Sequence, residues 1–218
     1  MSVAALPNVY QLRIRLDAIS PLIWRRLLVR SDTSIAFLHH LIQHAFGWTD
    51  SHLHRFIIHG KAYGIAYIGG ITFTDDPRQV RLADFCFRPN ERFTYEYDFH
   101  DLWRHEIRLE QILPLDPTQS YPVCTGGARA VPPEECGGPQ AFLALRQHCS
   151  IFHIAERLVA VLNGDDAIDD RQAELATLRY WLGIDRFDLC AVNSQFRQYA
   201  ANRQVRRCRH AHDNTGGH

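Results

Sequence analysis

Residues 92–110 read RFTYEYDFHDLWRHEIRLE, and along most of this segment apolar and polar side chains alternate one by one. An alternation of period two is the pattern of a strand with one buried face. The segment therefore predicts an aromatic hairpin of two amphipathic strands, with its turn near His100 and Asp101. On this register His105 points to the apolar side, while Asp98 and His100 lie near the turn on the polar side. A histidine among aromatic rings needs a hydrogen-bond partner.

The hairpin is followed by a segment rich in proline, glycine and cysteine, YPVCTGGARAVPPEECGG at 121–138. This composition predicts a shaped loop that is neither helix nor ladder strand. Loops of this kind often carry binding sites, and here two adjacent carboxylates lie between Pro133 and Cys136. We therefore predict an interaction surface made by the turn and the loop, comprising Asp98, His100, Asp101, Trp103, Glu134 and Glu135.

The remaining chain changes from strand to helix periodicity. Alternation predicts further strands at 10–16, 23–30, 52–59 and 63–65. Apolar residues at helical spacing predict an early helix over 35–46, which ends at Gly47. After the loop, the helical pattern covers 141–148, 151–162, 170–182 and a last helix that starts at Asp188. This order predicts an α+β fold with a mixed or antiparallel sheet, one early helix packed on it and a helical C-terminal third.

The pattern indicates one domain followed by a tail. The domain spans 1–200, with a strand-rich part at 9–112, the Pro/Gly/Cys loop at 113–139 and a helical part at 140–200. The tail at 201–218 is rich in arginine and histidine and has almost nothing apolar to bury, so we expect it to be disordered.

Charge and apolar runs limit the partners of the chain. Its 24 basic and 24 acidic residues give no net field that would attract nucleic acid or an anionic membrane. Neither a signal peptide nor an apolar run long enough for a membrane span is visible. We expect a cytoplasmic protein with reduced thiols and no membrane partner. Nucleic acid would need a local patch, for which the candidates are Arg13, Arg15, Arg25, Arg26 and the tail.

Metal-ligating residues occur in three places. His105, Cys124 and Cys136 would suit zinc if the loop folds back over the hairpin. The simpler interpretation, which we favour, is a packed histidine bonded to Tyr95 or Tyr97 beside two buried thiols. The other two candidates are a pair two residues apart, His52 and His54, and a tract in the tail, Cys208, His210 and His212.

Several motifs together resemble one known family. They are Trp24-Arg25-Arg26, the segment FGWTDSHLHRFIIHGKAYG at 46–64, the hairpin and the loop. In this order they are similar to the Ri-plasmid ORF-three-like family, also called TnpR-type passenger proteins of insertion elements. The resemblance runs from about Val9 to Phe196 and implies a compact α+β domain. His100 and Val131 stand where the family often has a glycine and a cysteine, which weakens a three-cysteine zinc site.

The resemblance implies no established activity, and the sequence contains no P-loop, nucleophile elbow, His-Glu-x-x-His or recombinase motif. Our leading interpretation is a non-enzymatic binding or accessory module, linked to mobile genetic elements, with no catalytic residue to name. The alternatives are a metal- or thiol-dependent enzyme that uses the 98–136 cluster, and a nucleic-acid-binding protein. Zinc is the one cofactor that the residues suggest, and the partner would be a protein or a nucleic acid.

Overall fold

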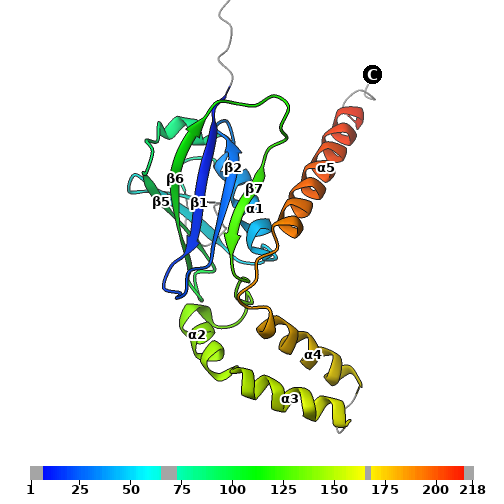
Figure 1. Cartoon of the computed structure of the whole chain (residues 1–218). Helices are drawn as coiled ribbons and strands as arrows, with labels where there is room; N and C mark the ends of the chain where they lie inside the picture. Colours follow the sequence, from blue (N-terminus) through cyan, green and yellow to red (C-terminus); the bar gives the residue numbers. More distant parts are fainter. Residues whose placement is uncertain (1–6, 65–72, 165–167, 214–218) are drawn as a thin grey trace, which may run out of the picture.

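The computed structural model of the chain describes residues 7–64, 73–164 and 168–213, with side chains described for all of these except 168–169 and 203–213. One antiparallel sheet of seven strands forms the body of the molecule, and helices form the rest (Figure 1). The strands are β1 (Val9–Leu16), β2 (Trp24–Arg30), β3 (His54–Ile58), β4 (Lys61–Gly64), β5 (Arg92–Tyr97), β6 (Trp103–Leu113) and β7 (Val123–Ala128). The α+β prediction is confirmed, including the early helix and the helical C-terminal part.

Helix α1 (Ile35–Phe46) lies behind the sheet in Figure 1 and covers one of its faces. The Ser34 side chain caps its first turn by accepting a hydrogen bond from the backbone N–H of Phe37, and Gly47 ends it with a φ of 66°. The buried face of α1 includes Leu38 and Leu41, both with no exposed surface. The helix therefore begins and ends where its capping residues predict.

Sheet order explains which residues reach the core. The strands follow one another as β4-β3-β5-β6-β1-β2-β7, so β5 and β6 form a hairpin at the centre. Tyr95, Tyr97 and Trp103 from this hairpin have no exposed surface. The aromatic alternation in the sequence thus marks the middle of the sheet, where one face is completely covered.

The Pro/Gly/Cys loop is not irregular throughout, which corrects our prediction. Its residues Val123–Ala128 form β7 and pair with β2 at the edge of the sheet. An edge strand needs a partner on one side alone, so glycines that would weaken a central strand are tolerated there. Gly127 is also required by packing, because a Cβ at this position would lie 2.6 Å from the Phe187 ring.

Four helices follow β7: α2 (Gly138–His148), α3 (Ile151–Asn163), α4 (Ile168–Leu182) and α5 (Leu189–Asp213). We call α2, α3 and α4 the arm, because they extend away from the sheet in Figure 1, whereas α5 returns beside α1 and β7. The short helix η1 (Leu82–Phe85) lies between β4 and β5. Two hydrogen bonds join the Asn193 side chain of α5 to the backbone of Cys124, each 2.9 Å long.

The C-terminal end differs from the sequence prediction. Helix α5 continues to Asp213, although we expected disorder from residue 201. Its alanines, glutamines and arginines are good helix formers, and a helix already started by Asp188 extends at little cost. Residues 214–218 and the side chains of the Cys208-His210-His212 tract lie outside the described part. None of the helices described is long and apolar enough to cross a membrane.

Candidate functional site

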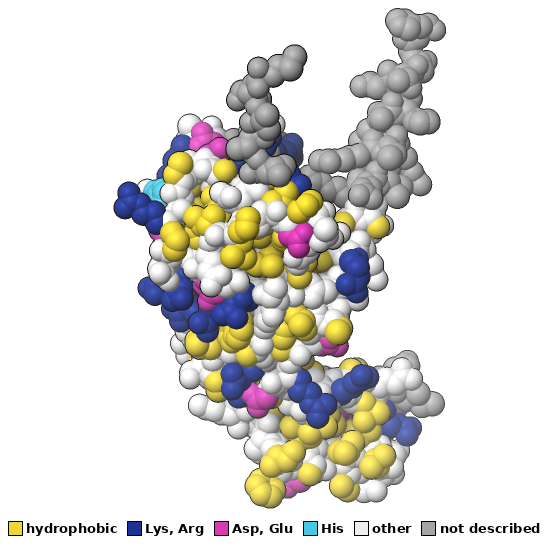
Figure 2. Space-filling model, turned by 45° about the horizontal axis from the view of Figure 1, so that its top comes forward, with side chains coloured by type: hydrophobic (Ala, Val, Ile, Leu, Met, Phe, Trp, Pro, Cys, Tyr) yellow, Lys and Arg dark blue, Asp and Glu magenta, His cyan; other side chains and the backbone are white. Residues whose placement is uncertain are grey.

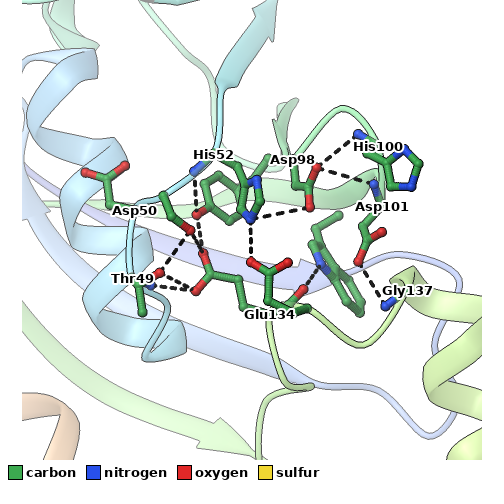
Figure 3. A network of polar contacts seen from close by, with 12 residues as sticks. Thr49, Asp50, His52, Asp98, His100, Asp101, Glu134 and Gly137 are labelled. Carbon is green, nitrogen blue, oxygen red and sulfur yellow. Dashed lines mark hydrogen bonds and ion pairs between the residues drawn. The ribbon is translucent and has the colours of Figure 1, made fainter.

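Hydrogen bonds hold the loop after β7 against the central hairpin and against the segment that follows α1. The indole of Trp48 donates to the carbonyl of Pro132 over 3.0 Å, and that of Trp103 donates to the carbonyl of Glu134 over 3.1 Å. The backbone N–H of Gly137 donates to a carboxylate oxygen of Asp101 over 3.0 Å (Figure 3). The structure thus brings the turn and the loop together, as the sequence predicts.

Glu134 lies at the centre of this contact. One of its oxygens accepts hydrogen bonds from the backbone N–H and the hydroxyl of Thr49, 2.8 Å and 2.7 Å long, and the other accepts one from the Tyr97 hydroxyl. Burial raises the pKa of this carboxyl, but the hydrogen bonds from Tyr97 and Thr49 outweigh it and lower the pKa overall. Glu134 is therefore held ionised between two segments that are far apart in sequence.

Glu135 and Asp98 are joined by a histidine that lies outside the strands. The Nε2 atom of His52 is 2.6 Å from a carboxylate oxygen of Glu135 and 3.8 Å from one of Asp98. Its hydrogen bond with Glu135 raises the pKa of His52. Asp98 is 5% exposed, so our placement of it on the polar side is corrected. It is buried because its carboxylate accepts the backbone N–H of His100 over 3.0 Å and closes the turn.

The six residues of the predicted surface therefore have different roles. Trp103 is a core residue, Asp98 and Asp101 close and tie the turn, Glu134 and Glu135 fasten the loop, and the His100 side chain remains exposed. Most of their polar atoms satisfy one another. These contacts hold the hairpin turn and the loop after β7 together, and they leave few polar groups free to bind a ligand.

The structure does not bring together the predicted ligands His105, Cys124 and Cys136. Among the described residues, one group of three His, Cys, Asp or Glu side chains has its ligand atoms within 4.8 Å of one another, and it contains none of these three residues. Cys124 lies on β7 beside Asn193, whereas His105 lies in the core on β6. β7 is separated from β6 by two strands in the sheet, which explains why these side chains do not converge.

His105 is packed among aromatic rings, with no exposed surface. Its ring lies edge-on to that of Phe46, with centroids 4.7 Å apart, and burial lowers its pKa to about 3. The hydrogen bond that we expected from Tyr95 or Tyr97 is absent, and neither ring nitrogen has a partner among the described residues. The Tyr95 hydroxyl instead bonds to His39, and that of Tyr97 to Glu134.

The group of three ligands is His39 of α1, Asp50 of the turn after α1, and His54 of β3. The Nε2 atom of His39 is 2.6 Å from an oxygen of Asp50, and the His39 and His54 rings are stacked with centroids 3.4 Å apart. We missed this group because we paired His54 with His52. The two do not share a face, since His52 precedes β3 and turns towards Glu135.

Charge states in this group follow from burial. Burial lowers the pKa of His39 and lowers that of His54 to about 3, so both imidazoles are neutral at pH 7. Burial raises the pKa of Asp50, but hydrogen bonds to His39 and His40 lower it overall. The group therefore combines two neutral imidazoles with one carboxylate.

The arginines proposed for nucleic acid separate onto two faces of the sheet. Arg25 is 3% exposed and donates to the carbonyls of Ala45, Ala128 and Arg129, and burial lowers its pKa to about 10. It is a core residue, which corrects its place among the candidates. Arg13, Arg15 and Arg26 lie on the opposite face, which α1 does not cover.

That uncovered face carries a row of arginines, of which sequence reasoning named two members, Arg13 and Arg26, but not the row. Arg13 of β1 lies directly opposite Arg26 of β2 on one side and Arg108 of β6 on the other. Arg108 in turn lies opposite Arg92 of β5. We call these four residues the arginine row. Lys and Arg side chains gather in a dark blue patch at the left of the sheet part of the molecule in Figure 2.

Comparisons with known proteins agree with this fold. The chain matches the model of a family described as "Plasmid pRiA4b ORF-3-like protein" over residues 8–195. The uncharacterized protein y4hQ of Sinorhizobium fredii (strain NBRC 101917 / NGR234) is 30% identical over 187 residues, which cover 85% of this chain and 87% of that protein. The crystal structure of a protein of unknown function, MM3350 from Methanosarcina mazei Go1, superimposes with a TM-score of 0.60 and 30% identity, over 85% of this chain and 97% of that chain.

Proposed function

This chain belongs to the plasmid pRiA4b ORF-3-like family, and from that premise we propose that it is a non-enzymatic binding module, accessory to mobile DNA, that holds nucleic-acid phosphates on the arginine row. The plasmid in the family's description supports the link to mobile DNA. The arginine row is the evidence that the ligand is a nucleic-acid phosphate backbone. The contacts that Asp98, Asp101 and Glu134 make with neighbouring segments support a bracing role for the surface that we first considered.

The single observation that carries the proposal is the cross-strand order Arg26-Arg13-Arg108-Arg92. Neighbouring strands are about 4.8 Å apart, and like charges placed directly opposite each other destabilise a sheet. A fold that keeps four guanidinium groups in one row therefore gains when an anion is bound across them. A phosphate backbone is an anion of the right extent, since it places several charges in a line.

Nearby carboxylates do not neutralise the row. Glu110 lies 2.6 Å from Arg26 and 4.0 Å from Arg108. Glu106 lies 3.6 Å from Arg92, but it also pairs with Arg15 over 3.0 Å. Asp17 also lies 3.5 Å from Arg15, so three carboxylates are shared among five arginines, and the face keeps a positive excess. Arg26, Arg92 and Arg108 side chains are 33%, 58% and 34% exposed, so a ligand can reach them.

Two guanidinium nitrogens of the row lack partners. The Nε atoms of Arg13 and Arg108 are buried and have no hydrogen-bond partner among the described residues. Beside the row, the guanidinium of Arg13 lies 4.9 Å from the ring centroid of Trp24, which fixes its plane. At the end of the row, position 126 of β7 is a glycine. Donors without acceptors in this row support an anionic ligand, which would approach through the exposed parts of the Arg26, Arg92 and Arg108 side chains.

Fluorescence anisotropy of a labelled DNA duplex, titrated with the full-length chain at several salt concentrations, tests the proposal. We expect binding that weakens steeply with salt. The double variant Arg13→Gln/Arg108→Gln should bind more weakly, with a logarithmic salt slope reduced by about 2, because two phosphate contacts are lost. The matched control is Arg88→Gln, an exposed arginine outside the sheet, which should bind like the native chain.

The tail contains further arginines, so a second variant separates the two sources of charge. It replaces Arg203, Arg206, Arg207 and Arg209 by glutamine. If this variant lost the binding while Arg13→Gln/Arg108→Gln kept it, the arginine row would not be the site. Absence of duplex and single-strand binding at low salt would also reject the proposal.

The compartment is part of the proposal. The cysteines that the structure describes, Cys86, Cys124, Cys136, Cys149 and Cys190, are free thiols. Free thiols suit a reducing compartment, and we therefore place the module in the cytoplasm, where plasmid DNA is found.

A further inference from the structure

We infer that His39, Asp50 and His54 form a binding site for a divalent transition-metal ion of the zinc class. The site lies on the covered side of the sheet and shares no residue with the arginine row. Metal binding at this site would add to the proposed nucleic-acid function. The two proposals are tested independently, because they involve different residues.

The spacing of the ligand atoms carries the inference. One nitrogen of His39, one nitrogen of His54 and one oxygen of Asp50 all lie within 4.8 Å of one another. Zinc binds such atoms at about 2.0–2.2 Å, so two ligands of one ion are about 3–4 Å apart. The two rings are stacked in parallel, so binding one ion through both nitrogens requires at least one of the rings to rotate out of the stack. Two imidazoles and a carboxylate are a ligand set that zinc and related ions prefer.

His54 provides a second, independent observation. It is 7% exposed, and no described residue forms a hydrogen bond with its ring, which instead stacks on His39 and lies near Tyr95 and Phe56. The His54 ring therefore has stacking contacts but no side-chain hydrogen-bond partner to hold its nitrogens. An ion held jointly with His39 would give this ring the partner that it lacks.

Neighbouring side chains hold His39 in a fixed orientation. Its Nδ1 atom is 2.8 Å from the Tyr95 hydroxyl, which also accepts a hydrogen bond from Gln43 over 2.9 Å. The side-chain amide oxygen of Gln43 accepts a hydrogen bond from the backbone N–H of Asp50 over 3.2 Å. Metal-binding histidines commonly use their second nitrogen in this way, and such partners fix the ring and support affinity. Gln43 and Tyr95 thus connect two of the three ligands.

One side of the group is open to solvent. The Asp50 side chain is 37% exposed, and His40 lies 3.3 Å from its second oxygen with 39% exposure. An ion can therefore enter from this side. Three protein ligands leave a fourth position for water, the arrangement found in open zinc sites. On binding, the proton on Nε2 of the neutral His39 ring would move to Nδ1, which faces the Tyr95 hydroxyl, and this change of tautomer frees Nε2 for the ion.

The test uses full-length, untagged chain and Zn²⁺ alone, by isothermal titration calorimetry together with metal analysis by mass spectrometry. We expect one ion per chain. Asp50→Asn, at an exposed and nearly isosteric position, and His54→Gln should each weaken zinc binding by at least about 10-fold, as loss of a ligand is more costly than loss of its support. Zinc should raise the melting temperature of the native chain and leave that of His54→Gln unchanged.

Two control variants exclude the other candidate ligands. Cys124→Ser should keep full zinc binding, and so should Cys208→Ser/His210→Gln/His212→Gln, which removes the tract in the tail. Cobalt should give visible absorption bands in the native chain that Asp50→Asn lacks. Zinc bound equally well by His39→Gln/His54→Gln, or no zinc bound by the native chain, would overturn the inference.

Discussion

In the sheet and α1, apolar side chains such as Leu12, Leu38 and Ile107 have no exposed surface, whereas on α3 of the arm Phe152 is 81% exposed and Leu162 74%. Hydrophobic side chains are visible on the lower lobe of the molecule in Figure 2. The sheet part therefore contains the interior that stabilises the fold, and the arm contributes little apolar burial of its own.

A few side chains within the arm are buried. Phe142 of α2 has no exposed surface and stacks on Trp181 of α4, with ring centroids 6.0 Å apart. Ile154 and Val161 form the buried side of α3, at 5% and 4% exposure. Substitutions of similar chemistry should consequently have very different effects in the two regions, and the following predictions measure that difference.

The largest effect should come from the centre of the sheet. Trp103→Ala should lower the free energy of unfolding by about 3–5 kcal/mol, because it removes a completely buried indole and leaves a cavity beside Trp48. It also removes the hydrogen bond that holds the loop at Glu134. Urea denaturation followed by circular dichroism measures the change. A loss below about 1 kcal/mol would mean that the sheet does not contain the stabilising core.

A smaller effect should come from the contact between sheet and loop. Glu134→Gln should cost about 1 kcal/mol at pH 7, because the amide cannot accept all the hydrogen bonds of the carboxylate. The folded pKa of Glu134 lies below its ordinary value of 4.5, so below that pH the unfolded chain binds a proton that the folded chain does not. The stabilisation is present above pH 4.5 and is lost as pH falls through the folded pKa.

Unfolding midpoints measured from pH 7 down to pH 3 test this dependence. The native chain should lose stability in the acid range, and Glu134→Gln should lose less. Glu156→Gln, on the exposed side of α3, is the matched control and should follow the native chain. Identical acid profiles for the native chain and Glu134→Gln would show that this carboxylate does not contribute.

The smallest effect should come from the exposed side of the arm. Phe152→Ala should change the free energy of unfolding by no more than about 0.5 kcal/mol, because the ring is mostly in water in the folded chain. Phe142→Ala is the same substitution on the buried side and should cost about 3 kcal/mol. If thermal denaturation gave equal losses for the two variants, the exposed and buried sides of the arm would not differ as described.

Much of the architecture could be predicted from the sequence. Alternation located the central hairpin, and the caps Ser34 and Gly47 placed both ends of α1. The turn and the loop of the predicted binding surface are in contact through the hydrogen bonds of Trp103 and Asp101, whereas the binding role of that surface stays a prediction. These signals are local, because a strand or helix with one buried face shows its period within a few residues.

Other features could not be predicted for definite physical reasons. β7 was missed because an edge strand tolerates the glycines that normally indicate a loop. Arg25 appeared to be a surface residue, yet backbone carbonyls from two distant segments accept its hydrogen bonds and allow its burial. The His39, Asp50 and His54 group has no motif, since its members come from a helix, a turn and a strand.

The sequence by itself determined the periods of the strands and helices, the positions of the caps and the family. Only the tertiary structure decided which of these elements are neighbours. The arginine row depends on the register of four strands, and the His39 group depends on α1 crossing β3. Both arise from pairing and packing between distant segments, and a side-chain pattern within one segment carries no information about the partner that it will face.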